Sequence, residues 1–409
     1  MITLLILISI VFAVKTIASA KRKYGFLLNH YTLHNVFWLM TIILSYYFNS
    51  YLVPVSTSVY YIFIFGLFFF NITILFVPHY SRRIPTIIVF SLKKRRIVEF
   101  VVLLFSIPQA YLNFKLIQQG VELWAINSEY WANQGTGIYI YSAIMQSVIA
   151  PLTTVLIATS FYNCYYDANN KSHYITIFIA ILLGVASLLS TGGGRTGILY
   201  LGFMLLLSYG ASSNFYVKNS VTHISKTLFG LVISVCIIGV SWATIERGHE
   251  SVFQEFINRY TLCAPLFEYY YYSSILKIHT YGSSTFEFMV SIFNYVLRPL
   301  DLDFEIVYNN SIIQEGVNVP ALEAKTNAYT TEYFNYIRDW GILGVMLGPY
   351  ILAFLYNLFF KVLKNNSFYM LFFIVGVLSW NLESHFAFLK NNCLSIIYCL
   401  VLCRFLRKT

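Results

Sequence analysis

Long apolar segments separated by short polar ones dominate this chain. Most of these segments approach the roughly 20 residues that a helix needs to cross a bilayer, and about eleven of them can be placed. They lie near residues 2–20, 33–53, 58–77, 97–117, 137–162, 174–190, 197–212, 227–245, 340–362, 367–388 and 391–405. This pattern predicts an all-α polytopic integral membrane protein.

One polar stretch, residues 246–339, is far longer than the others. At about ninety residues it is too long to be structureless in a compact protein. Apolar side chains recur at helical spacing over residues 251–276 and 285–297, which predicts amphipathic helices that lie on the membrane or dip into it. The polar residues 301–331 are expected to form an ordered loop.

Three regions follow from this pattern. They are N-terminal transmembrane helices in residues 1–245, a loop subdomain in 246–339 and C-terminal transmembrane helices in 340–409. With 58% hydrophobic and only 11% charged residues, the composition excludes an ordinary soluble protein. The six cysteines lack metal-ligand spacing, so packing roles are expected for them and no metal site is predicted.

The charges give the expected orientation. Most of the 27 basic residues fall in short loops on one side of the predicted helices, and nearly all of the 17 acids fall on the other side. Because short basic loops stay in the cytoplasm, we expect the N-terminus outside, the C-terminus inside and loop 246–339 outside. The basic loop 78–96 is expected to contact anionic lipid head groups. Nucleic-acid binding is not expected, since the basic residues form short loops and no folded basic face.

The sharpest local pattern is the segment from Ser190 to Gly197, in which three glycines precede Arg195 between two apolar segments. An arginine at this depth is costly unless it faces protein, water or an anion. Glycines such as Gly193 and Gly194 let backbone N–H groups approach a ligand, and the start of a helix favours anions. The pattern predicts a phosphate or diphosphate site. The alternative is an interfacial cap with glycines that serve helix packing.

Two further arginines lie beside the ends of predicted spans on the outer face, Arg298 and Arg338. Guanidinium groups bind phosphate oxygens through two parallel hydrogen bonds. We therefore expect both to join Arg195 in holding a diphosphate. The alternative for each is a structural salt bridge, with Asp301 and Asp339 respectively.

A sugar hydroxyl needs a base that works near neutral pH before it can act as a nucleophile. His249, His385 and Glu383 are the candidates on the outer face. Glu383 and His385 are two positions apart, so they do not share one face of a helix. A polar cap at the membrane surface is the alternative for this pair. His279 is expected to face solvent, and the remaining histidines are expected on the cytoplasmic side, away from an outer site.

Two segments of this chain resemble the O-antigen polymerases, which join oligosaccharide repeat units. Residues 190–197 are similar to the Ser-Gly-Gly-Arg-Thr-type segment of that family. Residues 326–330 (TNAYT) and 336–344 (YIRDWGILG) are similar to its segment TN-x-YT … y-x-D-[FW]-G-x-x-G, with Trp340 where related enzymes often have Phe. The predicted spans and the long, late outer loop also match the layout of the family.

The resemblance implies a membrane glycosyltransferase of the GT-C type at the periplasmic face of a Gram-negative inner membrane. Such enzymes transfer the growing chain from undecaprenyl diphosphate to the non-reducing end of a new lipid-linked unit, without a nucleotide sugar, cofactor or metal. Asn327, Tyr329 and Asp339 would order the outer loop or hold sugar. The implied partners are the undecaprenyl-diphosphate-linked oligosaccharide and membrane lipid; a polysaccharide chain-length regulator is a further candidate.

Two other functions are considered. An O-antigen ligase shares the architecture and the donor but transfers finished polymer to the lipid A core, and the pattern over residues 326–344 favours the polymerase. A flippase or transporter of lipid-linked oligosaccharide would carry ionisable residues at mid-membrane and pseudo-symmetric repeats. The sequence suggests neither feature.

Overall fold

The computed structural model shows two compact units. It describes residues 1–25, 27–48, 55–80, 91–119, 144–149, 260–272, 279–285, 317–319, 324–326 and 331–363, together with scattered residues within 152–257 and 398–407. Unit 1 comprises Met1–Arg82, Phe253–Lys361 and Trp380–Lys390, and unit 2 comprises Arg83–Val252, Val362–Ser379 and Asn391–Thr409. The three-region division along the chain stays a prediction.

Helices dominate the described residues, and four of the helical segments are long and apolar enough to cross a membrane. They are Ile2–Tyr24, Thr57–Phe76, Leu92–Leu116 and Thr331–Lys361. The chain is therefore a helical protein with several candidate membrane spans. The segments predicted at 2–20, 58–77, 97–117 and 340–362 correspond to these four, and a helix also covers much of the segment predicted at 33–53. The other predicted spans lie outside the described residues or are described only at scattered positions.

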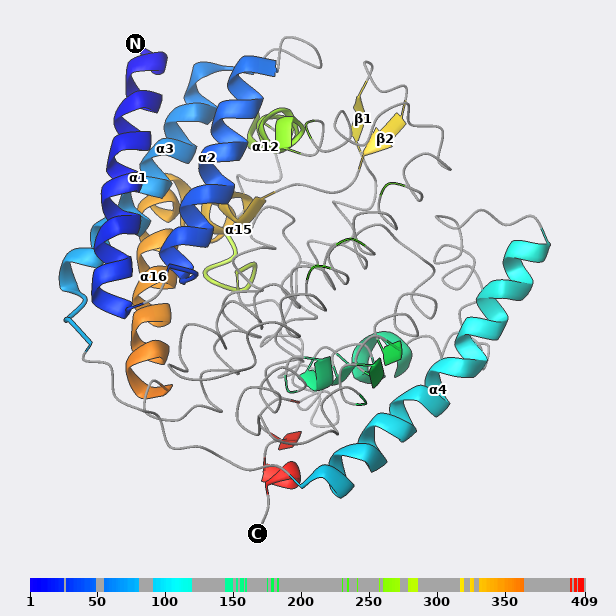
Figure 1. Cartoon of the computed structure of the whole chain (residues 1–409). Helices are drawn as coiled ribbons and strands as arrows, with labels where there is room; N and C mark the ends of the chain where they lie inside the picture. Colours follow the sequence, from blue (N-terminus) through cyan, green and yellow to red (C-terminus); the bar gives the residue numbers. More distant parts are fainter. Residues whose placement is uncertain are drawn as a thin grey trace, which may run out of the picture. The chain divides into compact units, whose positions relative to one another are not determined.

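Unit 1 is built on three packed helices, α1 (Ile2–Tyr24), α2 (His30–Phe48) and α3 (Thr57–Ile72), as Figure 1 shows. A short 3-10 turn, η2 (Thr73–Phe76), continues α3. One face of α1 buries small residues such as Ala13 and Ala20, while Leu7 and Val11 on the other face are exposed. An apolar face that remains exposed on a helix of this length suits contact with lipid.

The remainder of unit 1 comes from the late part of the chain. It contains α12 (Cys263–Tyr272), α15 (Thr331–Trp340), the 3-10 turn η7 (Gly341–Leu343) and α16 (Gly344–Leu363). An antiparallel hairpin pairs β1 (Val317–Val319) with β2 (Ala324–Thr326). The stretch 301–331 was predicted as loop, and this hairpin lies within it. Of the predicted amphipathic helix 251–276, the structure describes α12 and a few residues before it.

The main difference from the sequence-based prediction concerns α15. Residues 331–339 were expected in the outer loop because they are polar. They form a helix in which every residue except the last, Trp340, is buried. The helix packs against α12 and contributes Tyr333, Phe334 and Ile337 to the same core cluster as Trp38 of α2 and Phe63 of α3. Its polar side chains are therefore inside the unit.

In unit 2, α4 (Leu92–Gln118) has a buried polar face and an exposed apolar face. Arg95 is fully buried: its Nε donates to Glu99 Oε1 at 2.7 Å, and its other nitrogens donate to the carbonyl oxygens of Leu156 and Thr159. Arg96 also pairs with Glu99, at 2.5 Å. The expectation that the whole basic stretch 78–96 contacts lipid head groups is wrong for Arg95, whose charge is neutralised inside the protein.

Candidate functional site

The candidate site is α15, because it carries three ionisable side chains into the interior of unit 1. Glu332 is 3% exposed, Arg338 1% and Asp339 1%. Charges removed from water cost free energy unless they are paired or neutralised. Ionisable residues in the interior of a membrane protein are therefore retained mainly where they function.

The C-terminal end of α15 holds a segment of the long loop through Asp339. Its carboxylate accepts hydrogen bonds from Thr280 Oγ1 at 2.5 Å, from the backbone N–H of Ser284 at 2.9 Å and from that of Thr285 at 2.7 Å. Three donors on one carboxylate form a strong, charge-assisted contact. The turn 280–285 is thereby fixed to the helix.

Two further bonds join the same turn to α15. The backbone N–H of Thr280 donates to the carbonyl oxygen of Arg338 at 3.0 Å, and Ser284 Oγ donates to Asn335 Oδ1 at 3.0 Å. The segment 280–285 therefore contacts α15 over more than one helical turn, from position 335 to position 339.

Arg338 lies beside this contact, and its guanidinium carbon is 5.9 Å from the centre of the Phe334 ring. The predicted alternative for this residue was a salt bridge to Asp339. The carboxylate of Asp339 accepts three hydrogen bonds from the turn 280–285, and a carboxylate has about four acceptor positions, so the salt bridge stays an alternative. The role of Arg338 in binding a diphosphate stays a prediction.

The first turn of α15 is strained. Thr331 has a φ of 65°, in the left-handed region that a β-branched residue rarely adopts. The buried hydroxyl groups of Thr331 and Tyr333 make no hydrogen bond in the part of the chain that the structure describes. Strain and unsatisfied polar groups in one turn cost stability and cluster at functional sites.

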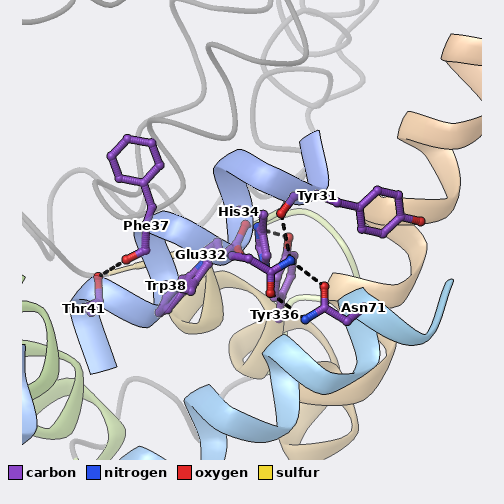
Figure 2. A network of polar contacts seen from close by, with 9 residues as sticks. Tyr31, His34, Phe37, Trp38, Thr41, Asn71, Glu332 and Tyr336 are labelled. Carbon is purple, nitrogen blue, oxygen red and sulfur yellow. Dashed lines mark hydrogen bonds and ion pairs between the residues drawn. The ribbon is translucent and has the colours of Figure 1, made fainter. Parts of the chain in front are cut away.

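Glu332, in this same turn, faces α2 (Figure 2). Trp38 Nε1 donates to its Oε1 at 3.2 Å, and the hydroxyl of Tyr336 donates to its Oε2 at 3.1 Å. His34 Nε2 lies 4.0 Å from Oε1. The ring of His34 stacks on Phe70 of α3, with centroids 3.6 Å apart. A carboxyl and an imidazole thus meet inside the helix bundle.

A second polar layer lies next to this one on α2. Asn35 and Asn71 exchange two amide hydrogen bonds, at 2.7 and 2.6 Å, which join α2 to α3. The hydroxyl of Tyr31 lies 2.7 Å from Thr73 Oγ1 and accepts a bond from Asn357 Nδ2 of α16 at 2.9 Å. This layer fixes three helices together, and we assign it a structural role.

Only two of the predicted site residues, Arg338 and Asp339, lie in the part of the chain that the structure describes. The others lie outside it: Arg195, Arg298, Gly193, Gly194, His249, His385, Glu383, Asn327 and Tyr329. The prediction missed Glu332 and His34. His34 was expected away from the outer loop, yet it lies against Glu332 of that loop. One feature of the sequence could have pointed to His34. It lies in the otherwise apolar segment 33–53, four positions before Trp38 and thus on the same helix face.

No family model, curated protein or solved structure matched this chain in three comparisons.

Proposed function

We propose that this chain is an O-antigen polymerase, a GT-C-like membrane glycosyltransferase with about eleven transmembrane helices. It would join undecaprenyl-diphosphate-linked oligosaccharide units into polysaccharide at the periplasmic face of a Gram-negative inner membrane. The observation that carries the proposal is the contact of Asp339 with the turn 280–285, because Asp339 belongs to a segment that resembles the polymerases. In the proposal, this contact fixes part of the outer loop to the helix that carries the polymerase-like segment.

In the same segment, residues 336–344, the backbone conformation and packing require glycine at positions 341 and 344. Gly341 has a φ of 62°, and a Cβ at this position would lie 3.1 Å from Cε1 of His279. A Cβ on Gly344 would collide with the backbone carbonyl of Tyr336. The backbone between α15 and α16 is thus closely packed at Gly341 and Gly344. This supports treating residues 336–344 as one structural motif.

The proposed reaction breaks the bond between the sugar C1 and the diphosphate oxygen of the donor. The acceptor hydroxyl oxygen bonds to C1, its proton passes to a base, and the diphosphate leaves with the bonding electron pair. Cations that neutralise the developing charge lower the barrier. In the proposal Arg195, Arg298 and Arg338 supply this charge. His249, His385 and Glu383 remain the candidate bases.

The polymerase proposal includes an orientation, with the N-terminus in the periplasm and the C-terminus in the cytoplasm. It also includes undecaprenyl-diphosphate-linked oligosaccharide as donor and acceptor, and a polysaccharide chain-length regulator as a candidate partner. No cofactor is part of the mechanism.

One observation favours a second candidate, a flippase or transporter of lipid-linked oligosaccharide. Such proteins use ionisable residues in the interior of the membrane. The pair Glu332 and His34 is of this kind. The polymerase is preferred because the resemblance covers two separate segments of the chain.

Lipopolysaccharide banding tests the proposal. A strain that lacks this gene is complemented with the wild type, Arg195→Ala or Arg338→Lys at matched protein level. A polymerase predicts that deletion reduces the ladder to core plus one repeat and that only the wild type restores it fully. Bare core with polymer accumulating on undecaprenyl diphosphate would identify a ligase. An unchanged ladder would reject both functions for that polysaccharide.

A further inference from the structure

The environment of Glu332 provides little compensation for a negative charge. Its carboxyl group is buried and receives two neutral hydrogen-bond donors, Trp38 Nε1 and the hydroxyl of Tyr336. Among the described residues, the only basic group within ion-pair distance is the imidazole of His34, at 4.0 Å. An ionised carboxylate beside a neutral imidazole would leave a net charge in an apolar interior, which is strongly disfavoured.

One added proton makes the pair of Glu332 and His34 neutral overall, whichever of the two side chains carries it. If the proton is on the carboxyl, both groups are neutral. If it is on the imidazole, the two groups form an ion pair, which is also neutral overall. Only the forms with no proton or with two protons leave an uncompensated charge, so burial favours the form with one proton.

Among the described residues, the other groups around Glu332 do not alter this balance. The remaining titratable side chains of α15 near the carboxyl are the phenols of Tyr333 and Tyr336, and α16 contributes Tyr356 next to Tyr336. On the side of α3, His34 contacts the Phe70 ring, and on α2 the carboxyl contacts Trp38. Of these phenols, that of Tyr336 is a neutral donor to the carboxyl, and the aromatic rings exclude water.

We infer that Glu332 and His34 form a proton-binding site between α2 and α15, in which the two side chains together hold one proton at neutral pH. The ligand is the proton itself. The same turn is strained and carries unsatisfied polar groups: Thr331 has a left-handed backbone, and the hydroxyl groups of Thr331 and Tyr333 lack hydrogen-bond partners in the described part of the chain. Such features cluster at functional sites. The inference is independent of the sugar chemistry proposed above.

Infrared difference spectroscopy of the purified full-length protein tests the inference. The spectrum of Glu332→Gln is subtracted from that of the wild type at neutral pH. The expected difference contains the carbonyl band of a protonated carboxyl or the ring bands of an imidazolium, because the substitution removes the shared proton in either case. A difference that contains only carboxylate bands means that the pair holds no proton, and this overturns the inference.

Two further variants keep the test decisive. Glu268→Gln is the matched control, since Glu268 is a carboxylate of the same unit that accepts the N–H of Ser56 at 2.9 Å and does not touch the pair. The band must persist in this variant. Trp38→Phe keeps both titratable groups and removes the donor to Oε1, so it is expected to shift the same band. A band that disappears in Glu268→Gln belongs to another group and rejects the assignment. A carboxyl carbonyl band that does not move in Trp38→Phe rejects it as well.

Discussion

Asp339 and Thr280 lie 59 positions apart in the sequence, and the hydroxyl of Thr280 donates to the carboxylate of Asp339 at 2.5 Å. This bond and the two backbone N–H donors beside it join the long loop to the buried helix α15. One carboxylate therefore accepts three of the hydrogen bonds that hold the turn 280–285 on α15.

The first prediction concerns this carboxylate. In Asp339→Asn one of the two oxygens becomes an NH2 group, which cannot accept the bonds that the turn donates. Hydrogen bonds to charged groups contribute about 1.5–3 kcal/mol. Amide hydrogen exchange at residues 280–285 should accelerate roughly ten- to hundredfold, which mass spectrometry of peptides from this segment would measure.

The control for this experiment is Tyr281→Phe, because Tyr281 lies in the same turn and its side chain is 85% exposed. Exchange in this variant should match that of the wild type. If Asp339→Asn also exchanges like the wild type, the carboxylate does not hold the turn.

The second prediction concerns Gly66, which packs under the ring of Tyr333. A Cβ at this position would collide with the phenol ring, so Gly66→Ala forces α15 away from α3. Overpacking of this kind costs typically 1–3 kcal/mol. The midpoint of thermal unfolding in detergent should fall. Gly66→Ala should cost less stability when it is introduced into a Tyr333→Ala background, because that substitution opens space for the methyl group.

Gly230→Ala is a matched control for Gly66→Ala, since nothing lies within 4 Å of the added methyl group. This variant should unfold at the wild-type temperature or slightly above it, because alanine favours a helix. Equal destabilisation by the two substitutions would contradict the packing argument.

The third prediction concerns the amide pair of Asn35 and Asn71. Replacing either residue with leucine leaves the other amide buried and unsatisfied, which costs about 1–3 kcal/mol. Replacing both removes the polar groups together. A double-mutant cycle on thermal unfolding should therefore give a loss for the double variant that is smaller than the sum of the two single losses. Simple additivity would mean that the two amides do not depend on each other.

The fourth prediction concerns Cys263 in α12. Its thiol is 1% exposed, and burial raises its pKa, so the thiol stays protonated at neutral pH. The thiolate is the reactive form. In a background where Cys263 is the only cysteine, maleimide labelling of the folded protein should be at least roughly tenfold slower than labelling of Tyr281→Cys in a cysteine-free background. Equal rates would show that α12 does not bury this side chain.

The lengths of the apolar segments were enough to predict the positions of α1, α3, α4 and α16. Each segment must be long enough to cross a bilayer, and this can be judged without knowing its neighbours. The same reasoning did not single out α15 as a buried helix. Its residues are polar, and a polar segment reads as exposed unless its partners are known. The partners of Glu332 are on α2, and a pattern within one segment carries no information about side chains so far away in the sequence.

Arg95 illustrates the same limit on a smaller scale. Three neighbouring basic residues, Lys93, Lys94 and Arg96, made the stretch look uniformly solvated. Helical periodicity turns Arg95 inward with Glu99, one turn later on the same face. Of the candidate site, the sequence pointed to Arg338 through its place beside the end of a predicted span, and to Asp339 through a resemblance between segments. The pairing of Glu332 with His34 became visible only with the tertiary structure.

The bond between Trp38 and Glu332 also has a consequence for how the protein is made. The two residues are 294 positions apart. At about 5–20 residues per second, ribosomes need roughly 15–60 seconds to synthesise the intervening chain. During that interval α2 is already available for insertion, but the carboxyl that accepts its indole N–H does not yet exist. The indole N–H of Trp38 therefore lacks this acceptor during that interval, and the bundle is complete only when α15, which is synthesised long after α2, packs into it.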